Sequence, residues 1–267
     1  MKKNLSYRLG IALLFLLFSY QQTTRAQDEA SGSDIRGLGS GGIRSLSEEM
    51  LNPATISFRE KGEISIFSFN RFGIKELSTS GIRGIFPNKR LNIGCKFLSY
   101  GYEDYRLTQG EISVAKNITP SLSLGIQFGC LHENSILQAQ NKMYYFADPG
   151  IYWKVHSKFK WAFVSKNLLS TFNNSKPAFY MGTLYKPVPE FQIHVESGLR
   201  LPGNSHFSFG ILYEILSQLS VRCGFRTDTS NPSIGASWEL GRWRIDTVFL
   251  LHNSLDLSSG IGVCYSL

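Results

Sequence analysis

The side chains that could do chemistry are charged residues in the last third of the chain. They alternate with apolar residues, which places them on one face of their predicted strands. The set is His194, Glu196, Glu214, Arg222, Arg226, Glu239, Arg244 and Asp246. Such a face could line a charged pore, form a polar binding patch or build a neutralising network in a filled interior. Charges of both signs tend to pair when they are partly buried, so the sequence favours the neutralising network.

Catalytic and metal-binding chemistry have little support in the sequence. No serine, histidine and acid on this face form a recognisable catalytic motif. The histidines are scattered, and Cys95, Cys130, Cys223 and Cys264 lack C-x-x-C spacing. The run GLGSGG at 37–42 has no strand before it, which a dinucleotide-binding loop requires. We therefore expect a non-enzymatic protein with no catalytic residue, no metal and no cofactor.

The start of the chain predicts export. Lys2, Lys3 and Arg8 precede the apolar run IALLFLLF at 11–18, and a small residue, Ala26, offers a cleavage point. This pattern is typical of a secretory signal peptide at 1–26, because the run is too short for a membrane span of about 20 residues. Cleavage removes four of the 28 basic residues and no acidic one, so the formal net charge falls from +8 to +4. No basic run survives that would indicate nucleic-acid binding.

From residue 61 onward the dominant pattern is period-2 alternation, which predicts antiparallel strands separated by tight turns. In PSLSLGIQFGC (120–130), Leu122, Leu124, Ile126, Phe128 and Cys130 share one face. An even number of strands of about 10 residues, with short turns at one end, indicates an outer-membrane barrel; an exported soluble sandwich is the alternative. Fourteen strands are predicted, at 62–71, 79–87, 90–100, 104–116, 121–132, 142–155, 158–167, 177–186, 190–200, 205–215, 219–227, 232–240, 242–251 and 259–267.

Parity along these strands predicts where the cysteines lie. Cys95, Cys130 and Cys223 share the apolar faces of their strands, so they should face lipid and stay reduced. Cys264 falls on the inward set.

A short helix is predicted ahead of the strands, in SLSEEMLNPATISF (45–58). Ser45 and Glu48 have the spacing of a capping box. Asn52 and Pro53 would end the helix, because proline disfavours a helical residue before it.

The chain resembles the FadL superfamily of outer-membrane barrels, and within it the PorV/PorQ-type branch of Bacteroidota. The resemblance rests on IRGLGSGGIRSLSEEMLNPATIS, NIGCKFLSYGYEDY, SVAKNITPSLSLGIQFG and FRTDTSNPSIGASWELGRWRIDTVFLLH. It implies a fourteen-stranded barrel at 61–267 with residues 27–60 folded inside as a plug. The plug residues would be Ser45, Glu48, Glu49, Asn52, Pro53 and Ala54. The two glutamates could pair with inward arginines such as Arg222, Arg226 or Arg244.

The resemblance implies two functions at the cell outer membrane. A PorV/PorQ-like barrel would be a closed interaction component of a secretion or surface-attachment machine, with cell-envelope proteins as partners. A FadL-like barrel would be a channel for uptake of hydrophobic small molecules. Under either hypothesis the barrel would contact outer-membrane lipid, in addition to its partner proteins or its ligand. The predicted outer loops at 201–205 and 227–231 are short and the predicted lumen has mixed charges, which favours the interaction component.

Overall fold

The computed structural model describes residues 34–136, 140–171, 176–252 and 255–267. The predicted signal peptide, 1–26, lies outside the described residues. The chain forms an α-helix, α3 (Ile35–Gly39), a 3-10 helix, η1 (Pro53–Phe58), and a sheet. The strands are β1 (Glu63–Arg71), β2 (Ile74–Phe86), β3 (Asn92–Gly101), β4 (Tyr105–Asn117), β5 (Leu122–Ser135), β6 (Gln140–His156), β7 (Phe159–Lys166), β8 (Leu169–Ser170), β9 (Ala178–Val188), β10 (Phe191–Arg200), β11 (Asn204–Leu216), β12 (Leu219–Arg226), β13 (Asn231–Leu240), β14 (Trp243–Leu250) and β15 (Ser258–Ser266).

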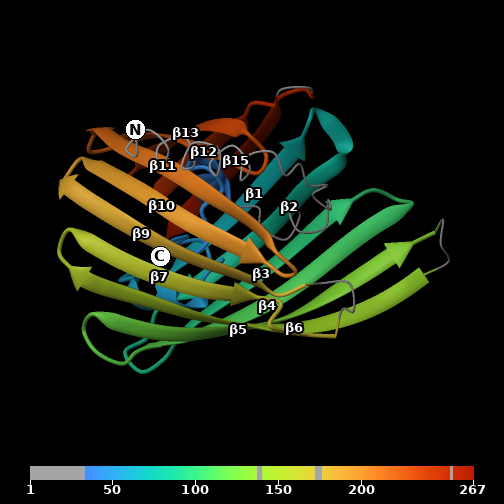
Figure 1. Cartoon of the computed structure of the whole chain (residues 1–267), viewed down its shortest axis with the longest axis horizontal. Helices are drawn as coiled ribbons and strands as arrows, with labels where there is room; N and C mark the ends of the chain where they lie inside the picture. The colour runs from blue at the N-terminus through green and yellow to red at the C-terminus, as the bar shows by residue number, and fades with distance from the viewer. Residues whose placement is uncertain (1–33, 137–139, 172–175, 253–254) are drawn as a thin grey trace, which may run out of the picture.

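The sheet closes into a barrel (Figure 1). Each long strand pairs antiparallel with the next long strand, β5 pairs with β6, and β15 returns to pair with β1, Glu63 opposite Ser266. The two-residue strand β8 pairs only with β6, at Phe146 and Ala147. Fourteen long strands therefore form the wall, which confirms the fold predicted from the alternation. Within the described residues, no helix has the length and apolar character of a membrane span.

Alternation along the strands puts apolar side chains outside and polar or small ones inside. On β11, Phe207 and Phe209 are exposed while His206 and Ser208 are buried. Ile66 on β1 is 57% exposed and Ile112 on β4 is also 57% exposed. Such an outer face suits lipid rather than water, because a water-soluble protein would bury these side chains.

The cysteine placement predicted from parity is confirmed. Cys95 and Cys223 are exposed on the outer face, Cys130 is half-buried and Cys264 is buried. All four are free thiols.

The two ends of the barrel differ in their connections. At one end, which we call the tight-turn end, the turns have two to five residues, at 87–91, 118–121, 157–158, 189–190, 217–218 and 241–242. Glu63 and Ser266 lie at the same end. At the opposite end, the loop end, the connections are 72–73, 102–104, 136–139, 167–177, 201–203, 227–230 and 251–257.

The helix predicted to begin at Ser45 and to end at Asn52 and Pro53 does not form, because the structure has turns and no helix over residues 45–51. Pro53 begins η1 instead of ending a helix, and the Asn52 side chain caps η1 by accepting a hydrogen bond from the Ala54 amide at 3.0 Å. Proline suits the first position of a helix, where its missing N–H would have no helical partner. The Ser45 hydroxyl does not form the capping-box hydrogen bond with the Glu48 amide. It donates instead to the Glu196 carboxylate on the barrel wall at 2.6 Å.

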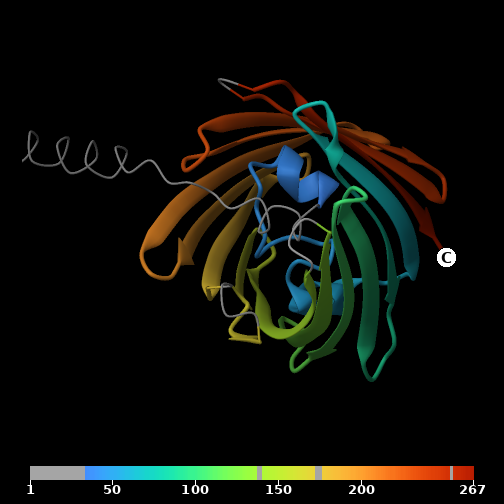
Figure 2. The same cartoon turned by 90° about the vertical axis from the view of Figure 1, so that its right-hand side faces the viewer.

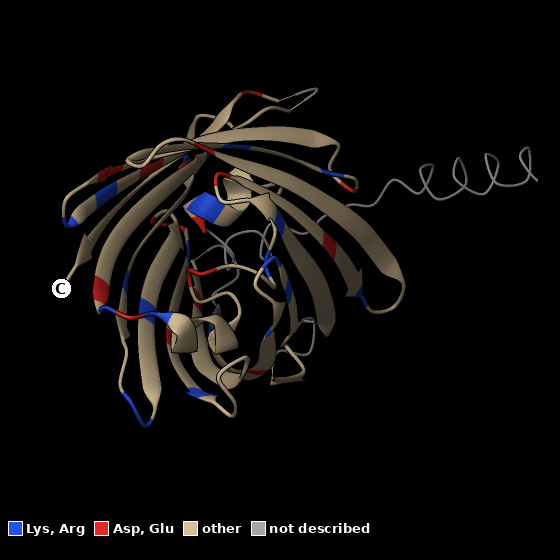
Figure 3. Cartoon of the chain, turned by 90° about the vertical axis from the view of Figure 1, so that its left-hand side faces the viewer, with Lys and Arg blue, Asp and Glu red and all other residues tan. Residues whose placement is uncertain are grey.

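The N-terminal segment, residues 34–60, lies inside the ring of strands (Figures 2 and 3). Small residues on the wall allow its backbone to come close. A Cβ on Gly224 would lie 2.1 Å from the Gly41 nitrogen, and one on Gly125 would lie 2.6 Å from the Ala54 nitrogen. Apolar side chains of the segment complete the packing: Ile43, Leu46 and Ala54 form a buried cluster with wall residues Tyr152, Ala162 and Leu184.

We expect the closed ladder to give heat-modifiable migration on a denaturing gel. Every wall strand pairs on both edges along much of its length, so opening the barrel requires many backbone hydrogen bonds to break together. Unboiled protein should therefore run at a different position from boiled protein. A single band at one position under both conditions would contradict closure of the sheet.

Candidate functional site

The N-terminal segment is held to the wall by a fully buried carboxylate, Glu196 on β10. It accepts hydrogen bonds from the Arg44 amide at 2.9 Å and from the Ser45 amide and hydroxyl, each at 2.6 Å. Consecutive backbone amides aimed at one anion form a strong, charge-assisted contact. Asn52 adds a second anchor, because its side-chain nitrogen donates to Ser45 O at 2.7 Å and to Ile151 O of β6 at 3.1 Å.

Two acidic residues of the segment meet arginines from several elements. Glu49 lies 3.2 Å from Arg83 of β2 and 3.6 Å from Arg244 of β14. Glu48 lies 3.1 Å from Arg36 and 3.3 Å from Arg59, both within the segment. Of the three arginines suggested by the sequence, Arg244 is a partner of Glu49. Arg222 lies 4.0 Å from Asp246, and Arg226 pairs with Asp228 at 2.6 Å.

These contacts set the protonation of the segment's acids. Burial opposes ionisation of Glu48, but Arg59 and Arg36 outweigh it and lower the pKa of Glu48 to about 2. Burial likewise opposes ionisation of Glu49, and Arg83 outweighs it, so the pKa of Glu49 lies well below its usual range. Asp34 behaves in the opposite way, because burial and the neighbouring Glu49 carboxylate raise the pKa of Asp34 to about 8.

A second network, outside the residues predicted from the sequence, spans β3 to β7. Lys96 pairs with Glu111 at 2.6 Å, and Lys166 pairs with Asp148 at 3.0 Å. Gln127 joins the two pairs by donating to Glu111 and accepting from Lys166. These residues share the inward parity of their strands, which is the signal that could have identified them.

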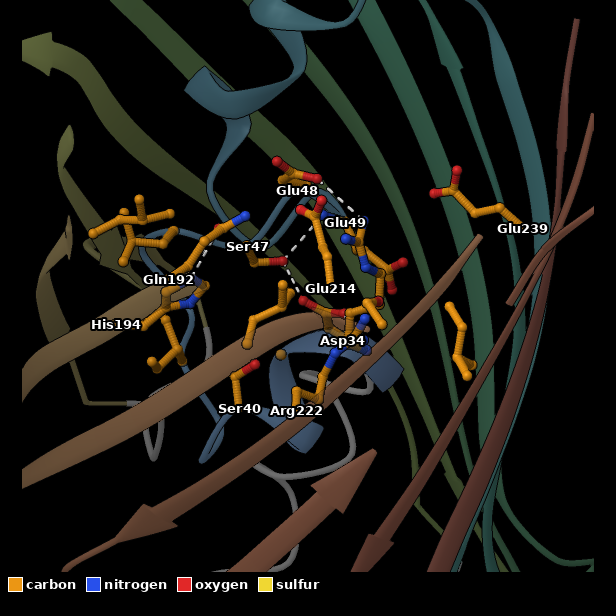
Figure 4. A pocket seen from close by; sticks show the side chains of 18 of the residues that line it. Asp34, Ser40, Ser47, Glu48, Glu49, Gln192, His194, Glu214, Arg222 and Glu239 are labelled. Carbon is orange, nitrogen blue, oxygen red and sulfur yellow. Dashed lines mark hydrogen bonds and ion pairs between the residues drawn. The ribbon is translucent and has the colours of Figure 1, made fainter. Parts of the chain in front are cut away.

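A cavity of about 310 Å³ opens between the segment and the wall at the tight-turn end (Figure 4). His194, Glu214, Arg222 and Glu239 of the predicted set line it, together with Glu48 and Glu49 of the segment. Glu196, Arg226, Arg244 and Asp246 lie outside its lining, although Asp246 contacts Arg222. Ser45, Asn52, Pro53 and Ala54 are buried between the segment and the wall.

The lumen changes character along the barrel axis on some strands. On β3 and β14 the inward side chains toward the tight-turn end include Lys96 and Arg244, whereas those toward the loop end are apolar. On β1 the inward Phe67 and Phe69 are followed by the buried Arg71 at the loop end. One apolar cluster comprises Ile35, Phe67, Phe69, Leu98 and Val248, with Leu38 and Leu250 packed against it. A second comprises Tyr100 and Leu107, with Leu77, Tyr105 and Leu131 beside it. The mixed-charge lumen expected from the sequence therefore covers only part of the interior.

A small cavity of about 60 Å³ lies between the segment and the wall on this apolar side. Its lining combines apolar side chains with charged and polar ones. The apolar ones are Leu38, Ile43, Leu51, Phe69, Phe72 and Leu250, and the charged ones are Arg44, Arg71 and Arg226. A cavity of this size holds a few water molecules. A larger apolar guest could enter only if residues of the segment moved.

Among the described residues, no group of three or more histidine, cysteine, aspartate or glutamate side chains is arranged to hold a metal ion. What the site does in this structure is to fix a segment across the lumen through ion pairs, hydrogen bonds and packing.

Comparison with known proteins shows a fold but no family. No protein-family model and no curated sequence matches the chain. Among solved structures, the chain is similar to "CymD monoaromatic hydrocarbon channel", with a TM-score of 0.67 and 12% identity over 86% of this chain and 96% of that one. It is also similar to the Pseudomonas putida toluene transporter TodX, with a TM-score of 0.65 and 11% identity over 88% of this chain and 97% of that one. At these identities the likeness concerns the barrel fold alone.

Proposed function

We propose that this protein is a non-enzymatic outer-membrane barrel that admits small hydrophobic molecules from its loop end. The observation that carries the proposal is the apolar inner surface at that end, formed by residues such as Phe69, Leu98 and Leu250. Apolar side chains facing the interior of a membrane barrel provide a favourable environment for an apolar guest, since each buried CH₂ gains about 0.8 kcal/mol. The proposal corresponds to the second hypothesis from the sequence, and the hydrocarbon channels of the same fold support it.

In this proposal the N-terminal segment is a plug that a guest must displace locally. The cavity beside Leu38 and Leu51, about 60 Å³, is too small for a molecule larger than a few atoms. The predicted division of the chain into a plug at 27–60 and a barrel at 61–267 fits this mechanism. The exposed apolar belt would contact outer-membrane lipid, and the short turns would face the periplasm.

A charge placed in this apolar surface should stop uptake. Leu250 packs against the inner apolar cluster, whereas its neighbour Leu251 is 51% exposed. Leu250→Arg therefore adds a charge to the inner surface, and Leu251→Arg adds the same charge at an exposed position. Cells producing Leu250→Arg should take up radiolabelled toluene no faster than cells without the protein, while Leu251→Arg should match the wild type. Heat-modifiable migration verifies folding of both variants. Equal uptake with and without the wild-type protein would contradict the channel.

The interaction component, which the sequence favours, is the other candidate function, and the short loop-end connections support it. The connections 72–73, 102–104 and 201–203 leave little chain for capturing a ligand outside the membrane. Purification of the native protein from membranes separates the two hypotheses. Stoichiometric envelope proteins would favour the interaction component, and a bound apolar molecule would favour the channel.

A further inference from the structure

We propose that the barrel rim at the tight-turn end binds the head group of an anionic phospholipid, on the side formed by β2, β3 and β4. Three exposed residues form the site: Lys89 and Arg90 in the turn between β2 and β3, and Lys116 near the end of β4. We call them the rim cations; they lie at the end of the barrel that faces the viewer in Figure 3. The inference goes beyond uptake, because it concerns the opposite end of the barrel and applies equally to a channel and to an interaction component.

The rim cations line one cavity, with a volume of about 350 Å³. Its lining comes from the turn between β2 and β3, from the adjoining ends of β3 and β4, and from residues 57–60 of the N-terminal segment. The charged members of the lining are the rim cations, Arg59 and Glu60. The space is large enough for the phosphate and glycerol groups of a phospholipid head group.

The cavity lining has an excess of positive charge. Arg59 is already neutralised, because it lies 3.3 Å from Glu48 and 3.2 Å from Glu63. Three rim cations then remain against the single carboxylate of Glu60, which also interacts with Lys154 of β6. Among the described residues, no acidic side chain forms an ion pair with a rim cation. A phosphodiester carrying one negative charge therefore reduces the repulsion between these cations.

The outer face of the wall next to the rim cations is apolar. Phe86 of β2 lies opposite Ile93 of β3, and Ile93 lies opposite Val114 of β4. Phe86 and Ile93 are exposed, as is Leu91 at the end of the turn. Lys116 follows Val114 by two positions, so it lies on the same outward face. A phospholipid of the periplasmic leaflet with its acyl chains on this face would have its phosphate level with the rim cations.

Hydrogen bonds fix the shape of the cation-bearing turn. The Asn88 amide donates to Asn92 Oδ1 at 3.1 Å, and the Arg90 amide donates to Asn88 Oδ1 at 3.2 Å. The Asn117 side chain donates to Ser57 O at 3.1 Å, which joins the end of β4 to the segment. Of the six tight turns, 87–91 alone carries two basic residues. A charged site that is already ordered loses less entropy when it binds a head group.

The apolar face beside the cations favours a lipid over an acidic protein, because a water-soluble partner would leave that face uncovered. Native mass spectrometry of the full mature protein in non-ionic detergent tests this choice. Dioleoylphosphatidylglycerol should bind at least about tenfold more tightly than dioleoylphosphatidylcholine, which has the same acyl chains but no net charge. Equal binding of the two lipids would overturn the proposal.

Two competitors distinguish the lipid from other anions. Neither inorganic phosphate nor a hexaglutamate peptide should displace dioleoylphosphatidylglycerol at equal concentration, because neither covers the apolar face. Displacement by phosphate would show a simple anion site, and displacement by hexaglutamate would show a surface for acidic proteins. Either result would overturn the lipid site.

Paired substitutions test the residues themselves. Arg90→Gln/Lys116→Gln should lower the affinity for dioleoylphosphatidylglycerol to that for dioleoylphosphatidylcholine. Lys158→Gln/Arg242→Gln is the matched control and should keep the preference, because it removes two exposed cations from two other tight turns. Heat-modifiable migration verifies folding of both variants. A preference retained in folded Arg90→Gln/Lys116→Gln, or an equal loss in the control, would overturn the proposal.

Discussion

Removal of residues 27–58 is expected to turn a silent barrel into a conducting one. The described part of the segment crosses the lumen and contacts β4, β5, β6, β12, β13 and β14, but it contributes no strand to the ladder. The wall should therefore still fold, because its backbone hydrogen bonds run between neighbouring strands. Loss of the segment removes the packing of Ile43, Leu46 and Ala54 against the wall and opens the lumen, whose wall carries charged residues such as Lys96 and Glu111.

Planar-bilayer recording measures this change directly. The intact protein should give no resolvable steps, and the deletion should give steps like those of an open porin. Heat-modifiable migration of the deletion shows that its barrel has formed. An intact protein that already conducts would refute closure by the segment. A folded but silent deletion would mean that wall side chains alone close the lumen, which favours a scaffold over a channel.

Replacement of Glu196 by glutamine should release the segment locally. A glutamine carbonyl at the Oε2 position could still accept from the Arg44 and Ser45 amides, but its NH2 group would then replace the Oε1 acceptor of the Arg44 amide. Loss of the negative charge and of this acceptor should weaken the anchor by about 2 kcal/mol. The ladder of β10 is untouched, so the barrel should remain closed and heat-modifiable.

Trypsin reports this release because the peptide bond after Arg44 is a potential cleavage site in a buried stretch. We expect rapid cleavage there in Glu196→Gln and slow cleavage in the wild type. Glu214→Gln is the matched control, since its carboxylate lies on the neighbouring strand, lines the open cavity and makes no contact with Arg44 or Ser45. Equal cleavage rates in Glu196→Gln and Glu214→Gln would refute the anchoring role of Glu196.

The helix error shows where local sequence signals lose to tertiary contacts. Ser45 and Glu48 have capping-box spacing, but a fully buried Glu196 binds the Ser45 amide and hydroxyl, and two arginines bind Glu48. These contacts provide stronger, charge-assisted partners than a neutral cap. Pro53 is predicted to end a helix, although Asn-Pro is equally suited to starting one. No local feature distinguishes the two cases.

The sequence by itself determined the strands, their number, their inward and outward faces and the placement of the cysteines. These follow from alternation, because successive side chains on a strand point to opposite faces whatever the strand pairs with.

Only the tertiary structure decided which charges meet, since Glu49 joins Arg83 and Arg244, residues that are far apart in the chain. Closure of the barrel also decided the axial order of the lumen. Because neighbouring strands are antiparallel and in register, Lys96 aligns with Glu111, and Tyr100 aligns with Leu107. On β3 and β14 the charged residues therefore lie toward the tight turns and the apolar ones toward the loops, while Arg226 and Asp228 form an ion pair at the loop end of other strands.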